Sequence, residues 1–232
     1  SANPKMFETV GNTIYVVCAG TNTLEKYSIS LGKTSVESSL INSVVVSGTP
    51  LSVSSNKYGL LAVTGLDTSN VQLIKDEDLS IISTTPIGGI GHGTCKFVGN
   101  TQLLVTDSTN DRLYSVNCED NLTPTVSSFI ATSTNPEQIE VIGNYCYIPS
   151  LTSVGVQAYL DCINISDAKT PILEESIALT LTGGGFTAPY TNGKDTYIYI
   201  SGHFAPYNID TVKVISGDIE RTYLNKVTTY SE

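Results

Sequence analysis

The sequence has no tryptophan, a single methionine and only two histidines, and its positive charge is low. Twelve Lys and Arg residues stand against 22 Asp and Glu residues, which gives a net charge of −10. Nucleic-acid binding depends mainly on cationic clusters that neutralise phosphates, so we expect no nucleic-acid partner. No run of about twenty apolar residues occurs, so we expect no membrane insertion. A cation such as calcium, or a basic protein, suits this acidic surface better.

Cysteine patterns that would indicate a metal site or a redox motif are also missing. The five cysteines are an odd number and include no CxxC pair, which predicts buried free thiols. They are Cys18, Cys95, Cys118, Cys146 and Cys162. Two glycosylation sequons, Asn121–Thr123 and Asn164–Ser166, favour an extracellular or particle-surface location and leave the compartment open.

One short phrase recurs five times along the chain: a turn rich in Gly and Asn, followed by a compact apolar run. The apolar runs are Ile14–Val17, Leu60–Val63, Leu103–Val105, Tyr145–Ile148 and Tyr197–Ile200. The steps between their last residues are 46, 42, 43 and 52 residues, a drift typical of loop insertions. Each run is β-branched or aromatic and bounded by turn formers, which predicts a strand buried on both faces.

Three further strands surround each buried run. A half-buried strand precedes it and carries Glu8, Lys96 or Glu140 at one position, a polar column that we expect to face a central channel. A third strand follows, as at 24–29, 71–74, 112–116, 156–160 and 211–215. A more polar fourth strand closes the unit, for example at 43–46, 80–83 and 127–131, with the last one within 222–230.

These repeats predict an all-β fold, a β-propeller of five four-stranded blades of about 45 residues. The expected single domain covers residues 1–232, with blades at about 4–48, 49–91, 92–134, 135–184 and 185–232. A β-sandwich also contains short alternating strands, but it does not predict the same phrase at a near-constant step. Closure by packing of blade one on blade five, closure by a marginal exchange of a terminal strand, and an open arc completed by another chain all remain possible.

The linker phrase Ser47–Pro50, the pair Asn135–Pro136 and the strand ending Leu103–Asp107 resemble YVTN-type and lactonase-like propellers. The fourth unit, from Gly143–Pro149 through Asp161–Ser166, resembles an LVIVD-type repeat. This resemblance implies the fold and not an activity, since surface-layer, adhesive, viral and enzymatic proteins share such repeats. Members usually carry six or seven blades, whereas this chain supplies five.

Two groups of residues are candidates for a functional site. His92, Asp107, Glu137 and His203 could meet at the mouth of the channel and hold a divalent cation, although two exposed loop histidines are the simpler interpretation. The loops at 152–156 and 202–209 offer a contact surface for a partner through Thr152, Val154, Phe204, Pro206 and Tyr207.

No catalytic residue is identified, since the chain has no Gly-x-Ser-x-Gly elbow and Cys95 lies on the apolar face of its strand. The leading hypothesis is therefore a non-catalytic binding or assembly module of a surface, adhesin or virion, with a protein partner or self-assembly. The first alternative is a lactonase-like hydrolase with an axial metal. The second is a carbohydrate-binding propeller, which predicts five similar pockets. No cofactor is predicted apart from that possible divalent cation.

Overall fold

The computed structural model describes residues 2–32, 35–88, 91, 93–152, 156–182, 184–191, 195–202, 208–214 and 222–228. Within these ranges the chain forms twenty β-strands and no helix, so no described segment meets the length and apolarity of a membrane-spanning helix. The strands form five antiparallel sheets of four. The predicted all-β propeller with five four-stranded blades is confirmed.

Each sheet is one blade, and its strands are numbered in chain order. Blade 1 consists of β1 (Pro4–Val10), β2 (Thr13–Cys18), β3 (Thr23–Leu31) and β4 (Val36–Val45). Blade 2 consists of β5 (Pro50–Ser55), β6 (Leu60–Gly65), β7 (Asn70–Lys75) and β8 (Ile81–Pro86). Blade 3 consists of β9 (Cys95–Val98), β10 (Gln102–Asp107), β11 (Arg112–Asn117) and β12 (Thr125–Ala131). Blade 4 consists of β13 (Glu140–Ile142), β14 (Tyr145–Pro149), β15 (Gln157–Asn164) and β16 (Ile172–Thr182). Blade 5 consists of β17 (Gly184–Thr191), β18 (Thr196–Gly202), β19 (Asn208–Val214) and β20 (Thr222–Thr228).

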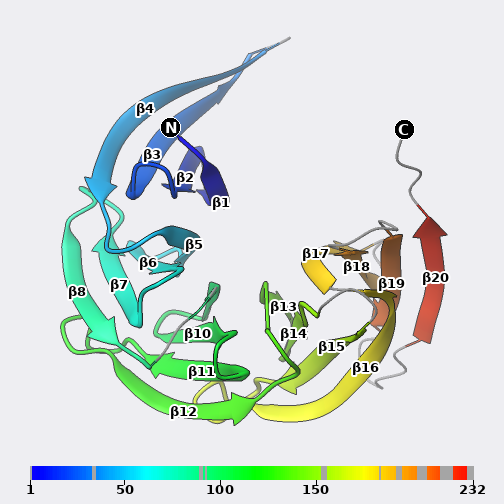
Figure 1. Ribbon diagram of the computed structural model, residues 1–232. Helices are drawn as coiled ribbons and strands as arrows, with labels where there is room; N and C mark the ends of the chain where they lie inside the picture. The colour runs from blue at the N-terminus through cyan, green and yellow to red at the C-terminus, as the bar shows by residue number, and fades with distance from the viewer. Residues whose placement is uncertain are drawn as a thin grey trace.

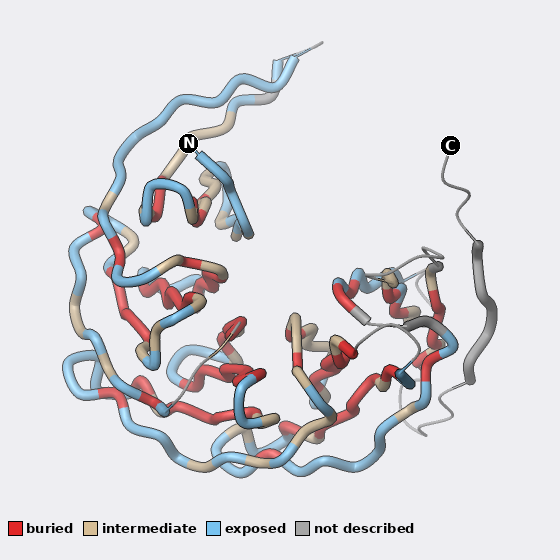
Figure 2. Tube along the Cα trace, viewed as in Figure 1, coloured by how far each residue is buried: buried red, intermediate tan, exposed pale blue. Residues whose placement is uncertain are grey.

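The blades follow one another around an axis, with their first strands toward the centre and their fourth strands outermost (Figure 1). The second strands β6 and β10 are buried along their whole length, because neighbouring blades cover both sides of these inner sheets. Figure 2 shows burial concentrated in these inner strands and exposure along the outer ones. The turn residues Gly11, Gly59, Gly99 and Gly143 have positive φ, which explains the Gly-rich half of the repeated phrase.

The core consists of four apolar clusters, one at each junction between consecutive blades in the described part of the chain. Between blades 1 and 2, for example, Tyr15 and Val17 pack against Leu61 and Val63. The other three clusters join blades 2 and 3, 3 and 4, and 4 and 5. The core is therefore a chain of interfaces, and each blade depends on its neighbours for cover.

Blades 1 and 5 stand apart, and the ring is open between them (Figure 1). None of the four apolar clusters joins a described residue of blade 1 to one of blade 5. Among the described residues, the expected packing of blade one on blade five is therefore not found. The described blades form an open arc.

The fourth strand of blade 1 is much longer than the expected segment 43–46. β3 and β4 form a long hairpin that projects from the arc (Figure 1). Nearly every residue of β4 is exposed, so the apolar alternation that identifies a half-buried strand is weak there.

Candidate functional site

The polar column of the first strands faces the channel, as the alternation predicts. Lys96 Nζ lies 3.8 Å from Glu8 Oε2, although β9 and β1 belong to blades 3 and 1. A cavity of about 210 Å³ beside this pair is lined by residues of four blades, among them Val53 and Ile139. Burial raises the pKa of Glu140, while the Lys96 ammonium opposes that rise. The described part of the channel wall thus carries the carboxyl groups of Glu8 and Glu140 beside the Lys96 ammonium.

Glu137, a predicted channel-mouth residue, lies just before β13. Its main-chain N–H donates to Pro149 O at 3.0 Å, and its carbonyl accepts from Thr94 Oγ1 at 2.9 Å. Burial raises the pKa of its carboxyl group to about 7. A carboxyl group with such a pKa exchanges its proton at neutral pH, as a general acid or base must.

Asp107 is fully buried at the end of β10. Its carboxylate accepts hydrogen bonds from Thr109 N at 3.0 Å, Asn110 N at 3.1 Å and Asn110 Nδ2 at 2.7 Å. These bonds close the β10–β11 turn, so the side chain stabilises its own hairpin. In the part of the chain that the structure describes, no three His, Cys, Asp or Glu side chains gather as a metal site requires.

Most other predicted site residues lie outside the described residues. His92, Val154, His203, Phe204, Pro206 and Tyr207 are in this group, and their roles stay predictions. Thr152 is described: it is buried, and its Oγ1 donates to Val156 O at 3.0 Å.

All five cysteines are buried free thiols, as expected. Cys95 Sγ lies 3.7 Å from Ser52 Oγ and 3.6 Å from Ala62 O. Burial raises the pKa of the Cys95 thiol to about 11, so thiolate is scarce at neutral pH. This agrees with the expectation that Cys95 is not a nucleophile.

The face of blade 1 that points away from blade 2 is exposed, whereas the corresponding face of other blades is buried. Phe7 lies opposite Val16 in the β1–β2 pair and is 66% exposed. The same position in blades 2, 3 and 5 is held by Val53, Cys95 and Thr187, which are 2%, 4% and 6% exposed. An apolar cavity of about 380 Å³ lies beside Phe7, lined also by Ile14 and Val16. This uncovered surface is called the leading face below.

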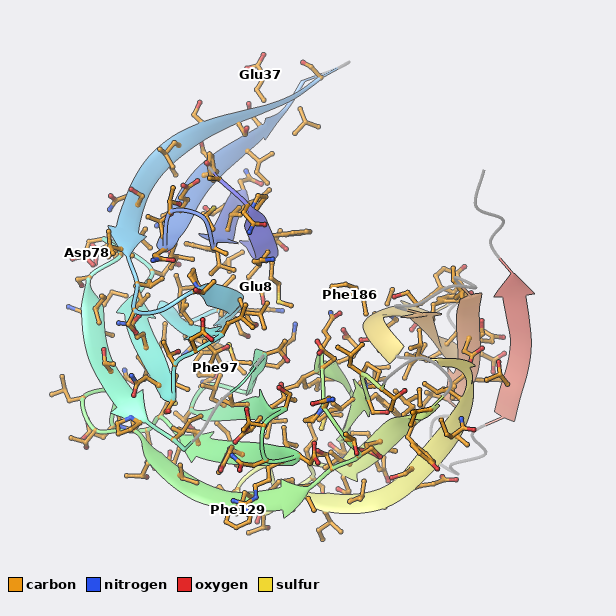
Figure 3. All side chains as sticks on the ribbon, in the orientation of Figure 1. Glu8, Glu37, Asp78, Phe97, Phe129 and Phe186 are labelled. Atoms are coloured by element: carbon orange, nitrogen blue, oxygen red, sulfur yellow. The ribbon has the colours of Figure 1, made fainter. Side chains whose placement is uncertain are left out.

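The far side of blade 5 shows the same departure. Tyr199 is 39% exposed, whereas Tyr15 and Tyr147, at the same position of blades 1 and 4, are 1% exposed. Tyr190 and Tyr197 stack beside it with ring centroids 6.5 Å apart. Phe186, also on blade 5, is 61% exposed and borders the opening of the arc in Figure 3. This surface is called the trailing face.

Sequence reasoning missed both faces. Phe7 and Tyr199 have the residue types expected for covered positions, and the repeat predicts the same burial in every blade. The available signal was the count of five blades against the six or seven of similar propellers. It predicts an open arc but not which side chains remain uncovered.

No protein-family model and no curated protein matches the chain. Solved structures do align with nearly all of it. A putative 6-phosphogluconolactonase from Bacteroides fragilis has a TM-score of 0.76 at 14% identity, over 97% of this chain and 70% of that one. The periplasmic gluconolactonase of Pseudomonas aeruginosa gives 0.76 at 14%, over 98% and 73%. A functionally unknown protein from Desulfotomaculum acetoxidans gives 0.75 at 12%, over 96% and 70%.

At such identities the likeness shows the fold alone: the neighbours include 6-phosphogluconolactonase-like propellers. The chain spans 70–73% of these three proteins. The unmatched part of each neighbour, about 30% of its length, corresponds to about two further blades of the size seen here.

Proposed function

We propose that the chain is a non-catalytic protein-binding module that assembles with a partner through its leading and trailing faces. The observation that carries this proposal is the exposure of Phe7, 66%, against 2% for Val53 at the same position of the next blade. Large contiguous apolar surfaces are uncommon on monomers and mark interaction sites.

The composition of the two faces supports binding. The leading face exposes Phe7, Leu40 and Val45, and the trailing face exposes Tyr190 and Tyr199. Aromatic side chains are enriched at the centres of protein interfaces because they bury a large area at a small cost in rotamer entropy. Burial of Phe7 alone is expected to contribute about 2 kcal/mol to association.

The test is affinity capture with the purified chain as bait, compared with a Phe7→Asp variant and followed by mass spectrometry. The matched control is Leu122→Asp, because Leu122 is 71% exposed on the turn between β11 and β12, away from both faces. Circular dichroism of both variants establishes that they fold. A partner retained by the parent chain is then expressed and rebound in pure form.

We expect Phe7→Asp to weaken binding of that purified partner at least tenfold, because a carboxylate is buried without a counter-charge. Leu122→Asp is expected to leave the affinity unchanged. Equal binding by the parent chain and by Phe7→Asp would exclude the leading face as the binding surface.

A second candidate function is hydrolysis of a lactone or ester in the channel. It is favoured by Glu137, whose pKa of about 7 suits proton transfer, and by Lys96, which could bind an anionic group of a substrate. Three of the similar structures carry gluconolactonase names. The described residues do not by themselves supply an axial metal site, so we derive no step through a metal.

This candidate is tested by lactone and ester hydrolysis with the parent chain and with Glu137→Gln, together with metal analysis of protein purified without chelator. Loss of a measurable rate in Glu137→Gln, with unchanged folding, would support it. Equal rates in both proteins, at the level of buffer alone, would exclude it.

A further inference from the structure

A hydrogen bond recurs between consecutive blades at one position of the repeat. An acceptor side chain on the third strand binds the main-chain N–H of a residue that follows the fourth strand of the preceding blade, or lies near its end. The donor and acceptor pairs are Ser47 and Gln72, Ser133 and Asp161, and Thr180 and Asp210. Their N···O distances are 2.7, 2.6 and 2.7 Å in that order. This bond is called the latch.

The latch has a fixed register in the sheets. Its acceptor pairs with the second-strand residue that faces the preceding blade: Val63, Ile148 and Ile200 hold that position in blades 2, 4 and 5. Where the donor is Ser133 or Thr180, the hydroxyl also donates to the second carboxylate oxygen, at 2.7 and 2.9 Å. The latch thus satisfies a buried carboxylate and a main-chain N–H at the same time.

Blade 3 has no such hydrogen bond among its described residues, but a tyrosine occupies the acceptor position and contacts the donor position. Tyr114 occupies the acceptor site opposite Val105, and its hydroxyl lies 2.8 Å from the point where a Cβ of Gly88 would stand. Gly88 is the residue in the donor register, and its φ is +114°. A bulky phenol therefore replaces the short acceptor, and glycine provides the space for it.

Blade 1 carries the same acceptor on its leading face. Glu25 lies opposite Val16, the residue in register with Val63 of blade 2. Glu25 is 8% exposed, and its carboxylate accepts hydrogen bonds from Thr23 and Tyr27 of its own strand. No described sheet packs on this face, although the apolar cavity beside Phe7, Ile14 and Val16 adjoins it.

We infer that the leading face receives the fourth-strand end of a propeller blade, whose main-chain N–H and adjacent Ser or Thr hydroxyl donate to Glu25. The occupant is a pair of four-stranded blades. This inference rests on the proposed function and names the fold that the two faces bind.

The size of the occupant follows from the comparison of lengths. The chain leaves a length of about two blades unmatched in the similar propellers, and the arc is open between blades 1 and 5. A second copy of this chain brings five blades, more than the length of about two blades that stays unmatched in the similar propellers. Two blades match that length. One packs on each uncovered face, and the two pack against each other to complete the ring.

The test uses the full chain extended at its C-terminus by a second copy of residues 49–134. The copied blade 2 should cover Tyr199 as blade 2 covers Tyr15, and the copied blade 3 ends with Ser133, a natural latch donor. Glu25→Ala and Glu25→Gln are introduced into both the original and the extended chain. Glu25→Gln is the conservative control, since Gln72 forms the latch in blade 2.

We expect Glu25→Ala to lower the folding equilibrium constant at least tenfold more in the extended chain than in the original chain. Glu25→Gln should restore most of that difference. Hydrogen exchange of β1 and of the copied Ser133 amide should slow in the extended chain and speed up again with Glu25→Ala. A second extension by residues 92–184, which ends at the Thr180 donor, provides the same measurement if the first extended chain does not fold.

Equal losses from Glu25→Ala in the original and extended chains, with unchanged exchange in β1 for both extensions, would overturn the inference. If Phe7→Asp still weakens partner binding in that case, the proposed function stands and the partner is not a blade. A closed extended chain should also fail to capture the partner, because its faces are already covered.

Discussion

Blades 1 and 2 share the same local structure and differ in what covers them. Val53 and Phe7 occupy the same position of the first strand, yet Val53 is 2% exposed and Phe7 is 66% exposed. The sheets have the same strand order and the same antiparallel pairing. The first-strand position held by Phe7 and Val53 is therefore an interface position of the repeat. It is buried only where a neighbouring blade packs on it.

The sharpest test of this comparison uses two tyrosines in register. Tyr147→Ala is expected to lower the free energy of unfolding by about 4 kcal/mol, because it leaves a cavity between blades 4 and 5. Tyr199→Ala should lower it by about 1 kcal/mol, since that ring is 39% exposed. Urea unfolding followed by circular dichroism measures both. Equal losses would mean that the trailing face is covered in the isolated protein.

The two latch acceptors give the next largest effect. Asp161→Ala removes the acceptor of Ser133 N, Ser133 Oγ and Ser176 Oγ, and we expect a loss of about 3 kcal/mol. Glu25→Ala in the original chain should cost about 1 kcal/mol, because its donors belong to blade 1. Thermal unfolding monitored by calorimetry separates the two. A loss from Glu25→Ala that matches Asp161→Ala would show that the leading face is already latched.

Buried and exposed carboxyl groups should also differ in how their contribution to folding stability changes with pH. Burial raises the pKa of Glu137 from 4.5 to about 7, so the folded state binds this proton more tightly than the unfolded state. Its contribution to stability is complete below pH 4.5 and is lost as the pH rises through about 7. Glu137→Gln should therefore be more stable than the parent chain at pH 8, by about 2 kcal/mol, with little difference at pH 4.

Asp78 provides the exposed control for this measurement. Hydrogen bonds from Ser80 hold the pKa of its carboxyl group below the usual value of 3.8. Asp78→Asn should therefore leave the slope of stability between pH 5 and pH 8 unchanged in urea titrations. A flat difference between Glu137→Gln and the parent chain over that range would show that Glu137 is solvated.

The smallest effect is expected on the leading face itself. Phe7→Ser should change the free energy of unfolding of the original chain by no more than about 0.5 kcal/mol, as should Leu122→Ser on an exposed turn. Both are measured by the same urea titration. A loss of about 2 kcal/mol for Phe7→Ser alone would mean that Phe7 is covered in solution, and the comparison with Val53 would fail.

Much of the fold was predictable because its signals are local. The phrase around Leu60–Val63 combines a turn with a short apolar run, and both features are legible in a few residues. The column of Glu8, Lys96 and Glu140 followed from alternation along single strands, and the structure brings Glu8 and Lys96 together. The long β3–β4 hairpin was underestimated, because β4 is exposed along nearly its whole length and carries little alternation.

The candidate site was less predictable, since its properties depend on distant residues. Asp107 matched a channel-mouth position, but its carboxylate closes the turn with Thr109 and Asn110. Glu137 was named as a channel-mouth candidate, whereas its raised pKa comes from burial, which the sequence does not show. Glu25 was not chosen at all, because the latch is recognisable only when the registers of several blades are compared.

The strands, their order and the number of blades could be predicted from the amino-acid sequence, because turn formers and residue alternation act over a few residues. The open ring, the exposure of Phe7 and Tyr199 and the latch position of Glu25 emerge only from how the blades pack. Burial and hydrogen bonding between blades depend on which sheet packs against which. For that reason, the same position of the repeat is buried in the core of one blade and exposed in another.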